Sequence, residues 1–219
     1  MKLRQFDALF HWWDSMRILV VTLLVGLCLL IGLYPLLYIL AEGPFGLLQN
    51  KPAAVISNPL WRVLFYLHIL SGGAALAIGW LQFFTRVRVQ RPRLHRTSGK
   101  LYVLLVIVSG TAALGIAPSS STGWIAGLGF TSLAVIWLSA TVLAFNRIRQ
   151  RDVRQHRNLM VYSYSACCAA VTLRLWLPLL LLVLKLDFTV AYPIVAWLCW
   201  VPNLLAARLI NSRTAAASR

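Results

Sequence analysis

Six apolar runs dominate this chain, and each is long enough to cross a lipid bilayer as a helix. A helix rises 1.5 Å per residue, so about 20 apolar residues cross the ~30 Å hydrocarbon core. The runs occupy residues 18–41, 63–84, 98–117, 124–145, 157–183 and 189–209. Of the 219 residues, 60% are hydrophobic and only 12% are charged, which is far from the composition of a soluble domain. The sequence therefore predicts an all-α polytopic membrane protein with six transmembrane helices.

The six runs leave little chain for any other domain. We expect residues 1–17, which mix aromatic and charged side chains, to lie in the head-group plane as a cytoplasmic interfacial segment. Residues 18–209 are then the transmembrane domain, and residues 210–219 a short cytoplasmic tail. The first run is too long for the apolar core of a signal peptide, so we interpret it as a retained helix.

The net charge of +16 is distributed unevenly between the two ends of the predicted helices. Most basic residues fall before the first run, between the second and third, between the fourth and fifth, and after the sixth. The opposite end carries Lys51, Arg62 and Lys185. This bias predicts that both termini and the two basic connections are cytoplasmic. Anionic lipid head groups are sufficient partners for these charges, and we expect no nucleic-acid binding.

The two basic connections repeat each other in register. Arg86, Arg88, Arg93, His95 and Arg96 recur 61 residues later as Arg147, Arg149, Arg154, His156 and Arg157. We interpret this as a duplicated helical hairpin, with one copy at about residues 63–117 and the other at about 124–183. Both copies would cross the bilayer in the same sense and form a central four-helix unit.

Helix-start signals place the two repeated histidines at equal depth. Proline is favoured at the first helical position and aspartate at the N-cap, and Pro92 and Asp152 fit these positions. His95 and His156 then fall in the first turns of the third and fifth spans. Two imidazoles at matched depth on neighbouring helices can point at one ligand.

A b-type haem is one ligand that such a pair can hold. Low-spin haem takes two axial nitrogen ligands from facing helices of a bundle, so His95 and His156 are the candidate ligands of the iron. Gly99, one turn after His95, would leave room for the macrocycle. Arg96 and Arg157 would neutralise the haem propionates at the cytoplasmic edge. The alternative is that the histidines only anchor the helices at the membrane surface.

Two further polar residues are predicted to lie inside the hydrocarbon. His68 falls six residues after Arg62 in the second span, roughly 9 Å below the outer interface. Arg174 falls in the outer half of the fifth span, where a guanidinium costs at least ~2.5–3.5 kcal/mol on insertion scales. Carbonyls near a helix break at Pro178, the carboxylate of Asp187, a lipid phosphate, or an anionic or carbonyl-bearing ligand such as a quinone would offset that cost. Structural snorkelling of Arg174 is the other interpretation.

Other chemistry is poorly supported by the residues. The sequence has no P-loop, no G-x-S-x-G elbow and no H-E-x-x-H motif, and its five acidic residues argue against acid–base hydrolysis. The four cysteines fall inside predicted spans without C-x-x-C spacing, so we expect them to be small core residues.

Three stretches resemble a known family. H-I-L-S-G-G-A-A-L-A-I-G-W-L-Q-F, L-H-R-T-S-G-K-L-Y and Q-H-R-N-L-M-V-Y-S-Y-S resemble the bacterial membrane proteins called domain of unknown function 2306, over roughly residues 60 to 210. The resemblance implies a six-span fold in the bacterial inner membrane. More distantly, the histidine plan is similar to cytochrome b561, which implies a second-span ligand at His68 and third- and fifth-span ligands at His95 and His156. The fourth-span ligand is missing between Gly123 and Phe130, so this resemblance implies at most one haem.

Two functions remain open from the sequence. The first is a haem redox protein that uses His95 and His156 and exchanges electrons with quinone or a cytoplasmic donor. The second is a non-enzymatic membrane protein, either a small transporter or an assembly partner. That protein would bind an anionic or lipid-like ligand between His68 and Arg174.

Overall fold

The protein is a bundle of six membrane-crossing helical segments. The computed structural model describes residues 2–41 and 43–216, with the side chains of residues 2–15 and 17 left out. Within these residues every regular element is helical. The segments long and apolar enough to span a membrane are Ile18–Leu40, Pro59–Phe83, Pro92–Ser119, Trp124–Arg149, Val153–Val183 and Phe188–Ala216. The predicted all-α fold with six spans is confirmed.

Several spans are built from more than one helical element. The first span joins α1 (Lys2–Leu33), η1 (Tyr34–Leu36) and α2 (Leu37–Leu40), and the second joins α4 (Pro59–Gly79) and η3 (Trp80–Phe83). The third joins α6 (Pro92–Ile116) and η4 (Ala117–Ser119), and the fourth is α7 (Trp124–Arg149). The fifth joins α8 (Val153–Cys167), α9 (Ala169–Pro178) and η5 (Leu179–Val183), and the sixth joins α10 (Phe188–Leu198) and α11 (Val201–Ala216). Short elements connect them: η2 (Gly46–Asn50), α3 (Ala53–Ile56) and α5 (Thr85–Gln90).

Two helical hairpins form the centre of the bundle. Helix α4 packs along α6, α7 packs along α8, and α6 joins the two pairs. At the centre, the hydroxyl groups of Tyr102 and Ser163 lie 2.9 Å apart, and these residues are separated by 61 positions, the offset of the basic repeat. Gly79 allows α4 to approach α8 closely, because a Cβ at this position would lie 2.5 Å from the ring of Tyr164. The duplication stays an interpretation, but equivalent positions of the two hairpins do meet.

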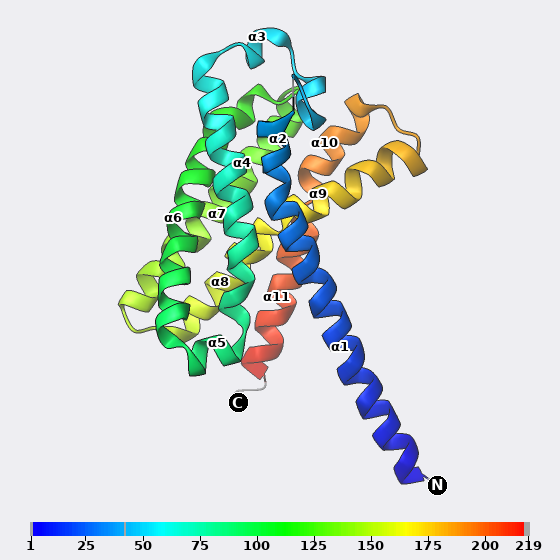
Figure 1. Ribbon diagram of the computed structural model, residues 1–219, viewed down its shortest axis with the longest axis vertical. Coiled ribbons are helices and arrows are strands. Elements are labelled where there is room, and N and C mark those ends of the chain that lie inside the picture. The colour runs from blue at the N-terminus through cyan, green and yellow to red at the C-terminus, as the bar shows by residue number, and fades with distance from the viewer. Residues whose placement is uncertain (1, 42, 217–219) are drawn as a thin grey trace.

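The predicted helix starts at the basic connections are confirmed. Helix α6 begins with Pro92, so this proline lies in the first turn of the helix. Asp152 caps α8, and its side chain accepts a hydrogen bond from the backbone N–H of Gln155 at 2.9 Å. His95 and His156 therefore both lie in the first turn of their helices, at the end of the bundle that carries α5, the start of α1 and the end of α11 (Figure 1).

The helices extend beyond the predicted apolar runs, mostly at the basic end. Helix α7 continues to Arg149, and α11 continues through the predicted 210–219 tail as far as Ala216, where the described residues end. Arginine is a good helix former, and a long charged side chain reaches the head groups from a helix that is still turning. Hydropathy alone therefore underestimates these helices.

The predicted interfacial segment, residues 1–17, stays a prediction, and its described residues belong to the first helix. Residues 2–33 form one helix, α1, without a break at residue 17, and Figure 1 shows it running straight past the end of the bundle. The stretch before Gly26 contains no proline or glycine, the residues that most readily interrupt a helix. The aromatic and charged side chains of residues 1–15, on which that prediction depends, are outside the described part of the structure.

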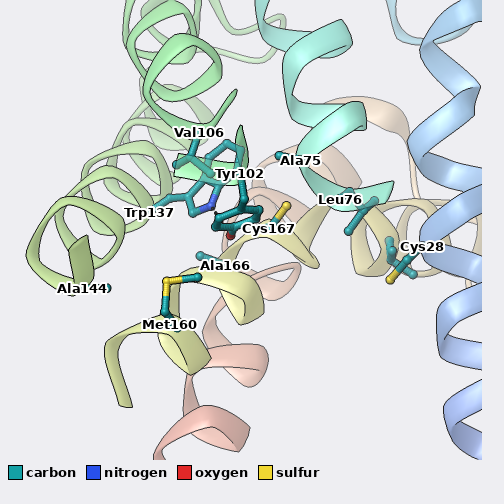
Figure 2. Packing of buried hydrophobic residues seen from close by; sticks show 11 residues of the cluster. Cys28, Ala75, Leu76, Tyr102, Val106, Trp137, Ala144, Met160, Ala166 and Cys167 are labelled. Atoms are coloured by element: carbon teal, nitrogen blue, oxygen red, sulfur yellow. Dashed lines mark hydrogen bonds between the residues drawn. The ribbon is translucent and has the colours of Figure 1, made fainter. Parts of the chain in front are cut away.

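The core is centred on Tyr102, which is fully buried between the hairpins. Figure 2 shows its ring beside Val106 and Trp137, with Cys167 from α8 beneath it. The hydroxyl of Ser163 lies 2.9 Å from that of Tyr102 and 2.6 Å from that of Thr141. In hydrocarbon, such side chains need partners inside the protein, and here they supply one another. The cysteines are free thiols within the bundle, in agreement with their expected role as small core residues.

Candidate functional site

Here the inner end of the bundle is its basic end, and the outer end is the opposite one. At the inner end, His95 is held by a side chain from the preceding span. Gln82, a buried residue of η3, lies with its amide against His95 and Ser98. With its nitrogen toward His95, the amide donates to Nδ1 at 3.0 Å and to the backbone oxygen at 3.2 Å. Its oxygen then accepts from the Ser98 hydroxyl at 2.7 Å and from the backbone N–H of Gly99 at 3.2 Å. A neutral imidazole that accepts at Nδ1 carries its hydrogen on Nε2.

The second inner histidine, His156, has a different partner. Its Nδ1 lies 2.9 Å from the backbone oxygen of Ala144 on α7. A carbonyl oxygen only accepts, so Nδ1 donates, and the lone pair of a neutral ring is on Nε2. The two imidazoles are close enough for the charge of one to influence the other. The structure thus brings the repeated histidines near each other, but with opposite tautomers.

The space beside Gly99 in the predicted haem site is occupied by a side chain. The position beside Gly99 is filled, because a Cβ there would lie 3.1 Å from the side-chain amide of Gln82. Arg96 and Arg157 are exposed at the basic end of the helices. A bis-histidine haem needs an Nε2 lone pair on both rings and room for the macrocycle. The side chains as they stand do not fit that group, and the haem stays a prediction.

The outer histidine, His68, is fixed by Ser109 of α6. The Ser109 hydroxyl donates to the backbone oxygen of His68 at 2.9 Å. The His68 Nδ1 lies 3.1 Å from the Ser109 backbone oxygen and 3.0 Å from its hydroxyl. Since the carbonyl only accepts, Nδ1 carries the hydrogen, and Nε2 of the neutral ring is an acceptor. No described residue donates to Nε2.

Arg174 has a cation–π contact and one hydrogen bond. Its guanidinium carbon lies 4.6 Å from the centre of the Tyr34 ring, and Nη1 donates to the backbone oxygen of Ala170 at 2.9 Å. This carbonyl lies one turn before Arg174, whereas carbonyls near the helix break at Pro178 were one of the predicted alternatives. The break itself is present, because α9 ends at Pro178 and a π-helical turn follows.

The other guanidinium donors of Arg174 have no acceptor among the residues described. The acidic residues whose side chains are described are Asp152 and Asp187, and neither is within ion-pair distance of Arg174. The predicted alternative of Asp187 as counter-ion is therefore not what the structure shows. A guanidinium has five N–H donors, so Arg174 can still bind an acceptor without losing its contact with Ala170.

His68 and Arg174 line one cavity in the outer half of the bundle. Its volume is about 250 Å³, and its walls come from α1, α4, α6, α7, α9 and α10 together with the segment 47–51. The lining is mostly apolar and includes the aromatic side chains of Phe65, Phe130, Trp137 and Tyr192. Such a mostly apolar space with a few polar groups is typical of small-molecule sites. His95 and His156 are not part of this lining.

Sequence reasoning missed several residues of these two regions. Gln82 and Ser109 hold the histidines, and Lys51, Trp61 and Ser120 line the outer end of the cavity. The signal for Trp61 was present, because Trp61, Phe65, His68 and Gly72 follow helical spacing and share one face of α4. Nothing in the sequence indicates that the turn carrying Ser120 folds over that face.

Comparison with known proteins agrees with the fold. The model of a family described as a predicted membrane protein, DUF2306, matches residues 65–211. The chain belongs to this family. The match includes His68, His95, His156 and Arg174, whereas Lys51 and Trp61 precede it. No curated protein and no solved structure matches the chain. The distant similarity to cytochrome b561 stays a prediction.

Proposed function

We propose that this DUF2306 protein is a non-enzymatic membrane protein that binds a small anionic or carbonyl-bearing, lipid-like molecule between His68 and Arg174. A small transporter or an assembly partner is the role that fits this activity. The observation that carries the proposal is the guanidinium of Arg174, which borders a cavity of about 250 Å³ with one hydrogen bond among the described residues.

The charge of Arg174 favours an acceptor as the ligand's polar group. A guanidinium within the hydrocarbon costs at least ~2.5–3.5 kcal/mol, and a bound carboxylate or carbonyl would offset part of that cost. The Nε2 acceptor of His68 adds a second polar contact that suits a hydroxyl group or a bound water. The aromatic walls suit an apolar body, including the ring of a quinone.

The cavity supports this function better than the inner histidine pair supports haem. At the inner end, the Gln82 amide donates to Nδ1 of His95, which leaves the hydrogen of that ring on Nε2, and the same amide fills the space beside Gly99. At the outer end, polar groups face an open volume. The haem redox protein is therefore the weaker of the two functions.

The expected membrane and orientation follow from the charges. The two arginine-rich connections lie at the end of the bundle where α1 starts and α11 ends (Figure 1). By the positive-inside bias, this end faces the cytoplasm of a bacterial inner membrane and contacts anionic head groups. The cavity then opens toward the outer half of the bilayer.

Equilibrium dialysis of the full-length protein in lipid nanodiscs tests the proposal. Radiolabelled octanoate is the anionic probe and menadione, a quinone head group, is the neutral carbonyl probe, with uptake by empty nanodiscs subtracted. We expect saturable binding of at least one probe, and a loss of at least about tenfold in affinity in Arg174→Leu. The control is Arg62→Leu, which removes an exposed arginine of α4 outside the cavity. Absence of saturable binding of both probes would contradict the proposal.

A further inference from the structure

The outer end of the cavity contains two hydrogen-bond donors without partners. Trp61 is only 7% exposed and lines the cavity, and its indole Nε1 has no partner among the described residues. The hydroxyl of Ser120, which lines the same cavity from the turn after η4, is buried and unpartnered within the same residues. An indole N–H only donates, and a buried donor without an acceptor costs free energy. These two groups therefore point to an acceptor inside the cavity.

A cation lies beside these donors. Lys51 also lines the cavity, and its Nζ lies 5.5 Å from the centre of the Trp61 ring and donates to the backbone oxygen of Ser119. An ammonium group has three donors, so this contact leaves Lys51 able to bind a further acceptor. Burial lowers the pKa of Lys51 from its ordinary value, and a nearby anion would oppose that shift.

This donor cluster is separated from the polar groups of the proposed site. Trp61 and His68 lie on the same face of α4, seven residues apart, which corresponds to roughly 10 Å along the helix. Two cations thus belong to the lining, Lys51 over the ring of Trp61 and Arg174 over the ring of Tyr34. The aromatic ring of Phe65 lies between Trp61 and His68 on this face of α4.

We infer that Lys51, Trp61 and Ser120 form an anion site for a second acidic head group, so that the cavity takes a two-headed molecule with an apolar centre. The inference rests on the proposed function, since it names the class of ligand for the same cavity. A molecule of this class is an α,ω-dicarboxylate or a similar diacid. One carboxylate contacts Arg174, and the other accepts from the Trp61 indole N–H and the Ser120 hydroxyl beside the Lys51 ammonium.

A matched pair of probes tests this inference in the full-length protein in nanodiscs. Octanoate has one carboxylate, and octanedioate has two on a chain of the same length. We expect the diacid to bind about tenfold more tightly than the monoacid, because it gains a second set of charge-assisted hydrogen bonds. Trp61→Phe keeps an aromatic ring but removes the N–H, and it should lower the ratio of octanedioate affinity to octanoate affinity to about one. Trp124→Phe, at a tryptophan that is 72% exposed on α7, is the control and should leave both affinities unchanged.

The outcomes separate this inference from the proposed function. If octanoate binds and octanedioate binds no more tightly, the inference is overturned, and the donors hold water only. The same conclusion follows if Trp61→Phe retains the full advantage of the diacid. If Trp61→Phe fails to fold, Ser120→Ala replaces it, with a loss of at least threefold of the diacid advantage expected and an unchanged advantage overturning the inference. If neither octanoate, octanedioate nor menadione binds, the proposed function fails and the inference fails with it.

Discussion

The two ends of this bundle use similar polar residues in opposite ways. At the inner end, the Nδ1 atoms of His95 and His156 are hydrogen-bonded to Gln82 and Ala144, so the protein satisfies its own polar groups. At the outer end, Arg174 and Trp61 line a cavity, and each has at least one N–H donor without an acceptor among the described residues. A repeated histidine motif is the more conspicuous sequence feature, yet unsatisfied donors beside an open volume are the better evidence for a ligand. The predictions below test this contrast between a satisfied end and an unsatisfied one.

Haem content is the all-or-none test of the inner end. The arrangement of Gln82 against His95 predicts that protein expressed with ample haem is colourless after purification. With its nitrogen toward His95, the amide donates to Nδ1, which leaves the hydrogen of that ring on Nε2, and the same amide fills the space beside Gly99. The measurement is the Soret absorption of the purified protein. A Soret band that disappears in both His95→Ala and His156→Ala would restore the haem redox function and contradict the contrast.

Gly79→Leu tests the close contact between the two hairpins at Gly79 and Tyr164. A Cβ added at Gly79 would lie 2.5 Å from the ring of Tyr164 and 2.8 Å from that of Tyr102, so a larger side chain must push the hairpins apart. We expect a loss of about 3 kcal/mol or more in the free energy of unfolding, measured in mixed detergent micelles. Gly26→Leu is the control, since nothing lies within 4 Å of a Cβ at Gly26. Equal stability of the two variants would show that this contact is not formed.

Gln82→Leu tests the structural role of the inner network. The substitution leaves Nδ1 of His95 without its donor, and we expect a loss of about 1–3 kcal/mol in the free energy of unfolding. Octanoate affinity should not change, because neither Gln82 nor His95 lines the cavity. A stable variant with altered octanoate binding would mean that the inner end, not only the outer end, contributes to the ligand site.

Ser109→Ala is expected to have the smallest effect. The variant removes the hydroxyl that donates to the His68 backbone oxygen, but the Ser109 carbonyl still accepts from Nδ1 of His68. We expect a loss of about 1 kcal/mol in stability and less than a threefold change in octanoate affinity. Thermal unfolding and dialysis of the same preparation measure both quantities. A loss of binding as large as that in Arg174→Leu would show that the orientation of His68 controls the site.

The fold was largely predictable, because hydrocarbon restricts the chain to helices and the apolar runs show where they lie. Pro92 and Asp152 placed the helix starts correctly, since their effects are local. The helix ends at the basic end of the bundle were underestimated, because arginine lowers hydropathy without ending a helix. The structure places His68 and Arg174 in the lining of one cavity, and their role as ligand-binding residues stays a prediction.

The partners of these residues were not predictable from spacing. Gln82 reaches His95 across the α4–α6 pair, and Ser109 reaches His68 across the same pair, so each contact depends on helix rotation and depth. Lys51 and Ser120 belong to connections whose fold over the cavity has no periodic signal. The position of Trp61 near the start of a span is also typical of interfacial tryptophans, and its buried, unpartnered N–H distinguishes it from such a residue.

Octanoate binding to Arg174→Leu and His156→Ala, measured side by side in nanodiscs, tests the central claim most directly. If the outer cavity is the ligand site, Arg174→Leu loses at least about tenfold in affinity and His156→Ala binds as the parent protein does. Loss of binding in His156→Ala with full binding in Arg174→Leu would contradict the claim and place the functional site at the inner end.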